Sequence, residues 1–82
     1  MLRIIEVEHL RDKIVRVAFD DGLVGEVDFE GRLDGPVFEP LRDEAYFAKV
    51  CVDPELETIA WPDGADLAPE FVKGLLLEQV PV

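Results

Sequence analysis

Apolar and polar residues alternate along the first third of the chain. Val15, Val17 and Phe19 occupy every second position, and after a turn Val27 and Phe29 do the same. A period of two is typical of strands with one buried face. The dipeptide at 21–22 is Asp-Gly, which predicts a tight hairpin because glycine accepts a positive φ freely. The pattern therefore predicts an antiparallel meander of three strands, at residues 4–10, 13–20 and 23–29.

The middle of the chain predicts a short helix followed by two more strands. Residues 30–36 are loop-like, with two glycines and a proline, and residues 37–41 are irregular. A helix at 42–49 is favoured because Asp43 and Glu44 stand early and Lys49 stands late, in accord with the helix dipole. Its expected core contacts are Leu41, Ala45, Phe47 and Ala48. The two further strands are predicted at 50–52 and 58–61.

The segment from Trp61 to Glu70 predicts a strand end, a turn and a helix start. Pro62 stops strand hydrogen bonding, and Asp63-Gly64 allows the chain to reverse. Asp66 precedes Leu-Ala-Pro-Glu, so it is the expected N-cap of a helix at 69–78, with an early proline and an acid in the first turn.

These elements define an α+β fold with two short helices. Its small antiparallel sheet combines the three-stranded meander with a second strand pair. No repeat, low-complexity tract or linker interrupts residues 1–82, so a single domain is expected. Leu75, Leu76 and Leu77 are consecutive and span more of a helix than one packed face needs. At least one of them, or Val80, should stay exposed, which predicts a homodimer or a partner interface through the C-terminal helix.

Composition adds a core and a strong negative charge. Of 82 residues, 49% are hydrophobic, which favours a folded chain over a disordered one. The sequence shows neither a signal peptide nor an apolar run long enough for a membrane span, so we expect a cytoplasmic protein with no membrane contact. Nineteen acidic residues against eight basic ones give a formal charge of −11. Such a surface repels phosphates and attracts cations, so it predicts a basic protein partner and no direct nucleic-acid binding by this chain.

Candidate chemistry is sparse. Cys51 lies in an apolar strand-like run and is expected to be a buried, inert thiol, and His9 is expected to play a structural part at the end of the first strand. Asp20-Asp21-Gly22 lacks the spaced acids of a calcium loop. Serine is absent, and chance pairs of carboxylates are unavoidable among nineteen acids. We therefore expect no enzyme, no cofactor and no metal.

Several motifs together resemble a known bacterial family, the domain of unknown function 2442. They are Phe-Asp-Asp-Gly at 19–22, Val-Asp-Phe at 27–29, the run 35–43, Phe47, Val-Asp at 52–53 and, above all, Ile-Ala-Trp-Pro-Asp-Gly-Ala-Asp-Leu-Ala-Pro-Glu at 59–70. The resemblance covers nearly the whole chain and implies a small α+β fold without defined catalytic residues. It also implies genes beside small basic proteins, in arrangements like toxin–antitoxin pairs. Some members carry a helix-turn-helix domain; this chain stops at Val82 without one, so that DNA-binding role is not expected here.

Three hypotheses follow. The first is a protein-interaction module, an antitoxin-like partner of a small basic protein, with the Trp61 turn and the last helix as contact. The second is a small-ligand or metal-binding domain that uses Asp63 and Asp66 near Trp61. The third is a purely structural acidic domain. The candidate interaction or structural residues are Trp61, Pro62, Asp63, Gly64, Asp66, Leu76 and Leu77.

Overall fold

The computed structural model of the protein describes residues 1–80 and contains two small antiparallel sheets and three short helical segments. The first sheet is the meander β1 (Ile4–Arg11), β2 (Ile14–Phe19) and β3 (Val24–Asp28), in that order. The second pairs β4 (Cys51–Asp53) with β5 (Thr58–Ala60). The helical segments are the 3-10 helix η1 (Pro36–Arg42), the helix α1 (Glu44–Phe47) and the helix α2 (Pro69–Gln79). The α+β class predicted from the sequence is confirmed, with its three-stranded meander and its second strand pair. The two parts form separate sheets instead of one, and η1 is present in addition to the two predicted helices.

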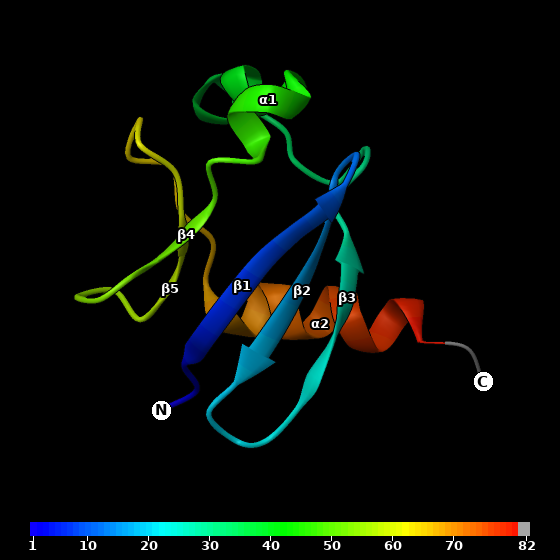
Figure 1. The fold of residues 1–82 in the computed structure, drawn as a ribbon, viewed down its shortest axis with the longest axis vertical. Helices are drawn as coiled ribbons and strands as arrows, with labels where there is room; N and C mark the ends of the chain where they lie inside the picture. Colours follow the sequence, from blue (N-terminus) through cyan, green and yellow to red (C-terminus); the bar gives the residue numbers. More distant parts are fainter. Residues whose placement is uncertain (81–82) are drawn as a thin grey trace.

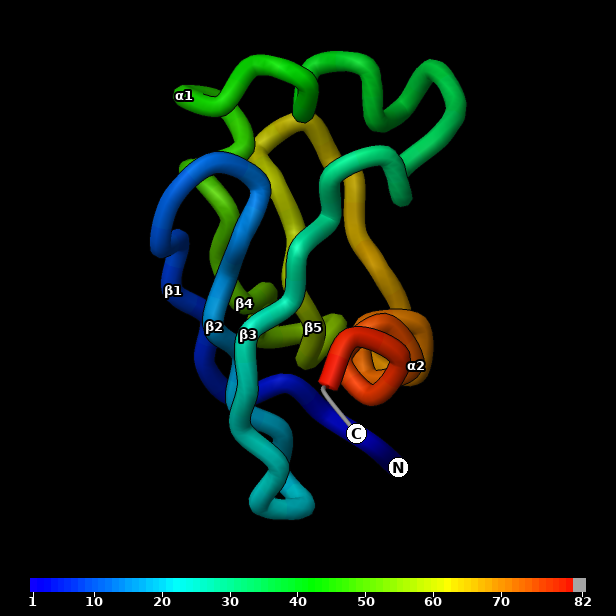
Figure 2. The backbone as a smooth tube through the Cα atoms, turned by 90° about the vertical axis from the view of Figure 1, so that its right-hand side faces the viewer, coloured from blue at the N-terminus to red at the C-terminus, as the bar shows by residue number. Residues whose placement is uncertain are grey.

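The helix α2 packs on one face of the meander, and the other face has no described element over it (Figure 1). The β4–β5 pair lies against β1, while η1 and α1 close the end of the molecule where β1 turns into β2. Figure 2 shows the same arrangement from the side of β3, with α2 next to that strand. The meander is therefore covered on one side only.

The period-two pattern buries the side chains that it predicts. Val15, Val17 and Phe19 on β2 and Val27 on β3 all face the core, and Phe29 follows them. The register of β1 shifts between Ile4 and Glu6, which explains why that strand alternates only in part. The rest of the core comes from β1, the two short helices, β5, the segment between β5 and α2, and α2 itself, with Ile4, Leu41, Phe47, Ile59, Trp61, Ala65, Leu67, Val72, Leu75 and Leu76.

The middle of the chain departs from the sequence prediction. The expected helix at 42–49 is reduced to one turn, α1, because Asp43 is extended and its carboxylate caps the helix through the Ala45 N–H at 3.1 Å. The supposedly irregular residues before it form η1 instead. Leu41 and Phe47 are buried as expected, whereas Ala45 and Ala48 are exposed. A single helical turn buries only one side, so the two alanines face outward.

Candidate functional site

The Trp61–Asp66 turn is built around backbone hydrogen bonds and one buried ring. The Trp61 N–H donates to the Ala65 oxygen at 2.9 Å, and the Gly64 N–H donates to the Trp61 oxygen at 3.0 Å. Trp61 is buried, as predicted, and its Nε1–H donates to the Phe47 oxygen at 2.9 Å. Gly64 has φ +94°, so the turn needs a glycine there. These contacts join the strand β5 to α1.

The two carboxylates of this turn act locally. Asp63 Oδ1 accepts the Ala65 N–H at 3.1 Å, which is an ordinary use of aspartate in a turn. Asp66 is exposed and forms a β-bridge with Ala60, so the chain is still extended at that point. The helix α2 begins three residues later, and Ala68 is its N-cap without a side-chain bond. The prediction that Asp66 caps this helix is therefore wrong.

Other residues singled out in the sequence lie apart from one another. Cys51 is exposed rather than buried, because it belongs to a three-residue strand at the edge of the fold. His9 is half-buried, with its ring edge-on to Phe47 and Nε2 within 2.9 Å of the Asp12 oxygen. Among residues 1–80, no three histidine, cysteine or acidic side chains gather where they could hold a metal ion.

The uncovered face of the meander, here called the acidic face, carries Glu6 and Glu8 on β1, Arg16 on β2, and Glu26 and Asp28 on β3. These side chains point away from the core because their neighbours in each strand point inward, and all five residues are exposed. The register places the exposed Arg11 of β1 opposite Ile14 on the same face, so four carboxylates share this face with two guanidinium groups. The sequence pattern contained this face, since these are the polar positions of the alternation, but it gave no reason to prefer it to the Trp61 turn.

A cross-strand row of alternating charge runs across the acidic face. Glu8 lies opposite Arg16, and Arg16 lies opposite Glu26. Arg16 pairs with Glu8 at 3.0 Å, and within residues 1–80 Glu26 has no ion pair. Across the same residues, five of the nineteen carboxylates form ion pairs, which leaves fourteen without one. Most of the negative charge is therefore free to act on a partner.

Two ion pairs join α2 to the β2–β3 turn and to the loop that follows β3. Lys73 Nζ lies 2.6 Å from the Asp21 carboxylate in the β2–β3 turn, and this hydrogen bond lowers the pKa of Asp21. Arg32 binds both carboxylate oxygens of Glu78, at 3.1 and 2.9 Å. The hydrogen bonds and the opposite charges lower the pKa of Glu78 and raise that of Arg32. Because their side chains are partly exposed, these pairs position α2 more than they stabilise it.

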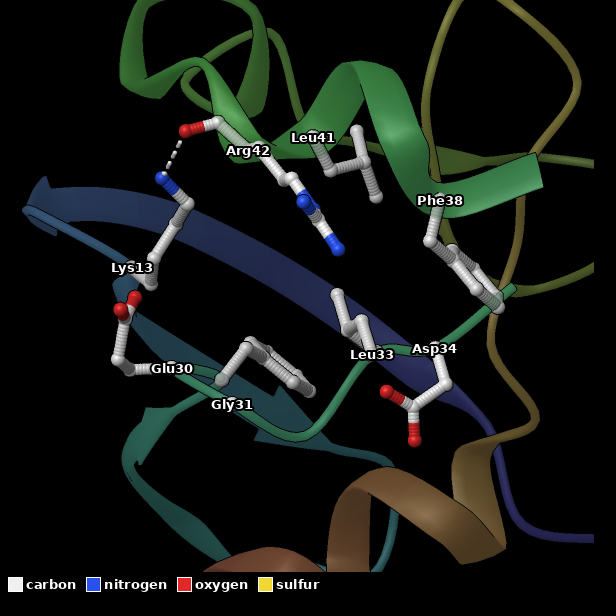
Figure 3. A pocket seen from close by; sticks show the side chains of 9 residues that line it. Lys13, Glu30, Gly31, Leu33, Asp34, Phe38, Leu41 and Arg42 are labelled. Atoms are coloured by element: carbon white, nitrogen blue, oxygen red, sulfur yellow. Dashed lines mark hydrogen bonds between the residues drawn. The ribbon is translucent and has the colours of Figure 1, made fainter. Parts of the chain in front are cut away.

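A cavity of about 370 Å³ lies between the end of β3 and η1 (Figure 3). Phe29, Leu33, Phe38 and Leu41 supply apolar walls, while Lys13, Glu30, Asp34 and Arg42 supply charges of both signs. Lys13 Nζ donates to the Arg42 oxygen at 2.8 Å across its rim. The arrangement can accept an apolar group with a charged end. No residue of the Trp61–Asp66 turn lines it, so the sequence-based ligand hypothesis does not coincide with this cavity.

Comparison with known protein families identifies the family of this chain. Residues 4–73 match the family described as "Protein of unknown function (DUF2442)". The chain belongs to the DUF2442 family. The resemblance found in the sequence is thereby confirmed, and the Trp61–Asp66 turn lies inside the matched region. No curated protein matches the chain. Within residues 1–80, no helix has the length and apolar run that crossing a bilayer would require.

One solved structure shares the fold of this DUF2442 chain. It is described as "Putative DNA Binding Protein NE0471" from Nitrosomonas europaea, with 26% sequence identity and a TM-score of 0.82. The match covers 96% of this chain and 51% of the Nitrosomonas chain, so this chain spans about half the length of that protein. The expectation of no nucleic-acid binding is corrected by this finding. The net charge of a chain does not by itself decide whether the chain binds nucleic acid, because charge is distributed unevenly over a protein surface.

The C-terminal helix of this DUF2442 chain exposes apolar side chains, as predicted. Leu75 and Leu76 are buried, whereas Leu77 is 56% exposed and Val80 is 49% exposed. Leu76 lies directly on the backbone of β3, where a Cβ at Gly25 would come within 2.9 Å of Leu76 Cδ1. Leu76 is therefore a core residue and not a contact for a partner. Self-association through this helix stays a prediction.

Proposed function

We propose that this DUF2442 chain is a non-catalytic protein-interaction module whose acidic face binds a small basic protein, like the antitoxin half of a pair. The single observation that supports it is the acidic face itself. A sheet face with four carboxylates, two guanidinium groups and no element of residues 1–80 over it attracts a cationic surface and discourages random association.

The proposal differs from the sequence-based hypothesis in the contact that it assigns. Trp61, Pro62 and Gly64 serve the turn, and Leu76 serves the core. We instead assign the contact with the partner to the strands β1 and β3. Their exposed carboxylates lie on either side of β2, on one face of the sheet. Attraction to this face is long-range, so it acts mainly on the rate of encounter and on the choice of partner.

Nucleic acid belongs in any test, because the Nitrosomonas protein is described as a "Putative DNA Binding Protein". Duplex DNA is therefore included as a competitor for the chain.

The experiment compares two variants with the same change of charge. Glu6→Gln, Glu8→Gln and Glu26→Gln together neutralise the acidic face, and Glu55→Gln, Asp66→Asn and Glu70→Gln neutralise three exposed acids elsewhere. A protein captured from the native host by the wild-type chain is identified, purified and titrated against all three chains. We expect a basic protein whose Kd rises about tenfold or more for the first variant and changes little for the second.

Three results would contradict the proposal. One is a captured protein without a basic surface. Another is equal weakening by both variants, which would mean that only total charge matters. The third is binding of duplex DNA by the chain with no binding of a protein partner.

A further inference from the structure

The strand β3 is the edge of the meander that lies away from the β4–β5 pair, which contacts the other edge strand, β1. The Phe19 N–H donates to the Leu23 oxygen at 2.8 Å, and the Phe29 N–H donates to the Lys13 oxygen at 2.9 Å. Because hydrogen-bonded and non-hydrogen-bonded pairs alternate in an antiparallel ladder, the even-numbered residues between them direct their N–H and C=O groups away from β2. These residues are Val24, Glu26 and Asp28.

One of these three positions is already closed by a side chain. The Asp28 N–H donates to Gln79 Oε1 at 2.9 Å, and Gln79 Nε2 donates to the Asp28 oxygen at 2.9 Å. The amide of Gln79 thus takes the place that a peptide group of a neighbouring strand would occupy. Within residues 1–80, the outward backbone groups of Val24 and Glu26 have no hydrogen-bond partner. The edge is therefore shaped for strand pairing and left open over two positions.

The C-terminal end of the helix α2 lies beside this edge, on the covered side of the sheet. The helix crosses behind β3 and continues past it (Figure 1), and Figure 2 shows its last turns next to the strand. The exposed apolar side chains of Leu77 and Val80 belong to this projecting end. A strand added to β3 would have side chains of one face above the end of α2, so apolar residues suit that face.

The cross-strand row of alternating charge indicates which side chains suit the other face of an added strand. Across the acidic face the order is Glu8, Arg16, Glu26, and the last of these has no ion pair within the described residues. A cation on the next strand would continue the alternation and neutralise Glu26. A second copy of β3 would instead bring carboxylates against carboxylates, which is unfavourable.

We infer that β3 is a docking edge for an extended segment of the basic partner, in which basic and apolar residues alternate. The segment pairs with the backbone of Val24 and Glu26, as in other cases where a peptide adds a strand to a sheet. Its basic side chains lie beside the acidic face, and its apolar side chains lie over the end of α2. This inference rests on the proposed function and adds the mode of binding.

The test uses three peptides of alternating lysine and valine with blocked ends. The first peptide is unmodified. The second is N-methylated at every second residue, so one edge of its backbone loses its N–H donors. The third is N-methylated at the remaining residues, so the opposite edge loses them. Binding to the full chain is followed by NMR, together with hydrogen exchange of the Val24 and Glu26 amides. We expect the unmodified peptide to slow exchange at both amides, with Gly25 and Val27 slow in every state. One methylated peptide should bind at least tenfold more weakly than the other.

A variant separates strand pairing from charge. Gln79→Ala frees the Asp28 groups and lengthens the open edge, so it should tighten peptide binding, on the order of tenfold for two added hydrogen bonds. Equal affinity of both methylated peptides, with binding still lost on neutralising the acidic face, would overturn the strand-pairing inference and leave the proposed function standing. Absence of any exchange change at Val24 and Glu26, or no tightening by Gln79→Ala, would also overturn the inference.

Discussion

Trp61 is the largest buried side chain of the turn formed by residues 61–66. Its ring lies 5.6 Å from that of Phe47 between centroids, and its N–H binds the Phe47 oxygen. Trp61→Ala should lower the free energy of unfolding by about 3–5 kcal/mol because it leaves a cavity. Trp61→Phe keeps most of the ring and should cost only about 1–2 kcal/mol for the lost hydrogen bond. Urea denaturation of both variants measures this; equal losses would mean that the ring volume is unimportant.

Two glycines make a matched pair for a stability test. Gly64 has φ +94°, whereas Gly74 lies inside α2, and an added Cβ would meet no atom within 4 Å at either position. Gly64→Ala should therefore destabilise the protein by about 1 kcal/mol through backbone strain alone. Gly74→Ala should stabilise it by about 0.5–1 kcal/mol, since alanine is the better helix former. Thermal unfolding of the two variants should shift in opposite directions, and a shift in the same direction would contradict this account.

At the scale of elements, α2 lacks a side-chain cap. Ala68 has φ −61° and ψ 139°, the extended geometry that a capping residue needs. Ala68→Ser should stabilise the protein by roughly 0.5–1 kcal/mol by accepting a free N–H of the first turn. Asp66→Ala, by contrast, should change stability by less than about 0.5 kcal/mol. Chemical denaturation distinguishes the two positions, and a large loss for Asp66→Ala would restore its role as a cap.

The Arg32–Glu78 pair gives stability a pH dependence with a definite sign. Hydrogen bonds from Arg32 lower the pKa of Glu78 in the folded state. A carboxyl with a lowered pKa stabilises the fold above its unfolded pKa, about 4.3, and this stability is lost as the pH falls through the folded pKa. Glu78→Gln should therefore be less stable than wild type near pH 7. The difference should shrink toward pH 3, as measured by urea midpoints at both pH values, and a difference that grows on acidification would contradict the assignment.

The sequence pattern predicted the elements whose formation depends on residues close together in the chain. Alternation at Val15, Val17 and Val27 fixed the meander, and Pro69 marked the start of α2. It failed where a distant contact decides the outcome. Asp66 looks like a cap but is held extended by its bridge to Ala60, and Cys51 looks buried but lies at an edge. The acidic face could be anticipated from polar alternation, whereas the Gln79–Asp28 pairing joins residues 51 positions apart and has no local signal.

For the whole molecule, the place of the charge matters more than its total. The value of −11 led to an expectation about nucleic acid that the Nitrosomonas protein corrects. The helix α2 covers one face of the meander (Figure 1), and the exposed carboxylates of β1 and β3 lie on the other face. A function based on this asymmetry makes a spatial prediction, which total charge does not.

Hydrogen exchange with mass spectrometry on the complex with the captured partner tests that prediction most directly. The account predicts slower exchange in the segments that form the acidic face and its edge, residues 5–8 and 23–28, with little change at the turn formed by residues 61–66. Protection at the turn or around the cavity between β3 and η1, with residues 5–8 and 23–28 unchanged, would contradict it.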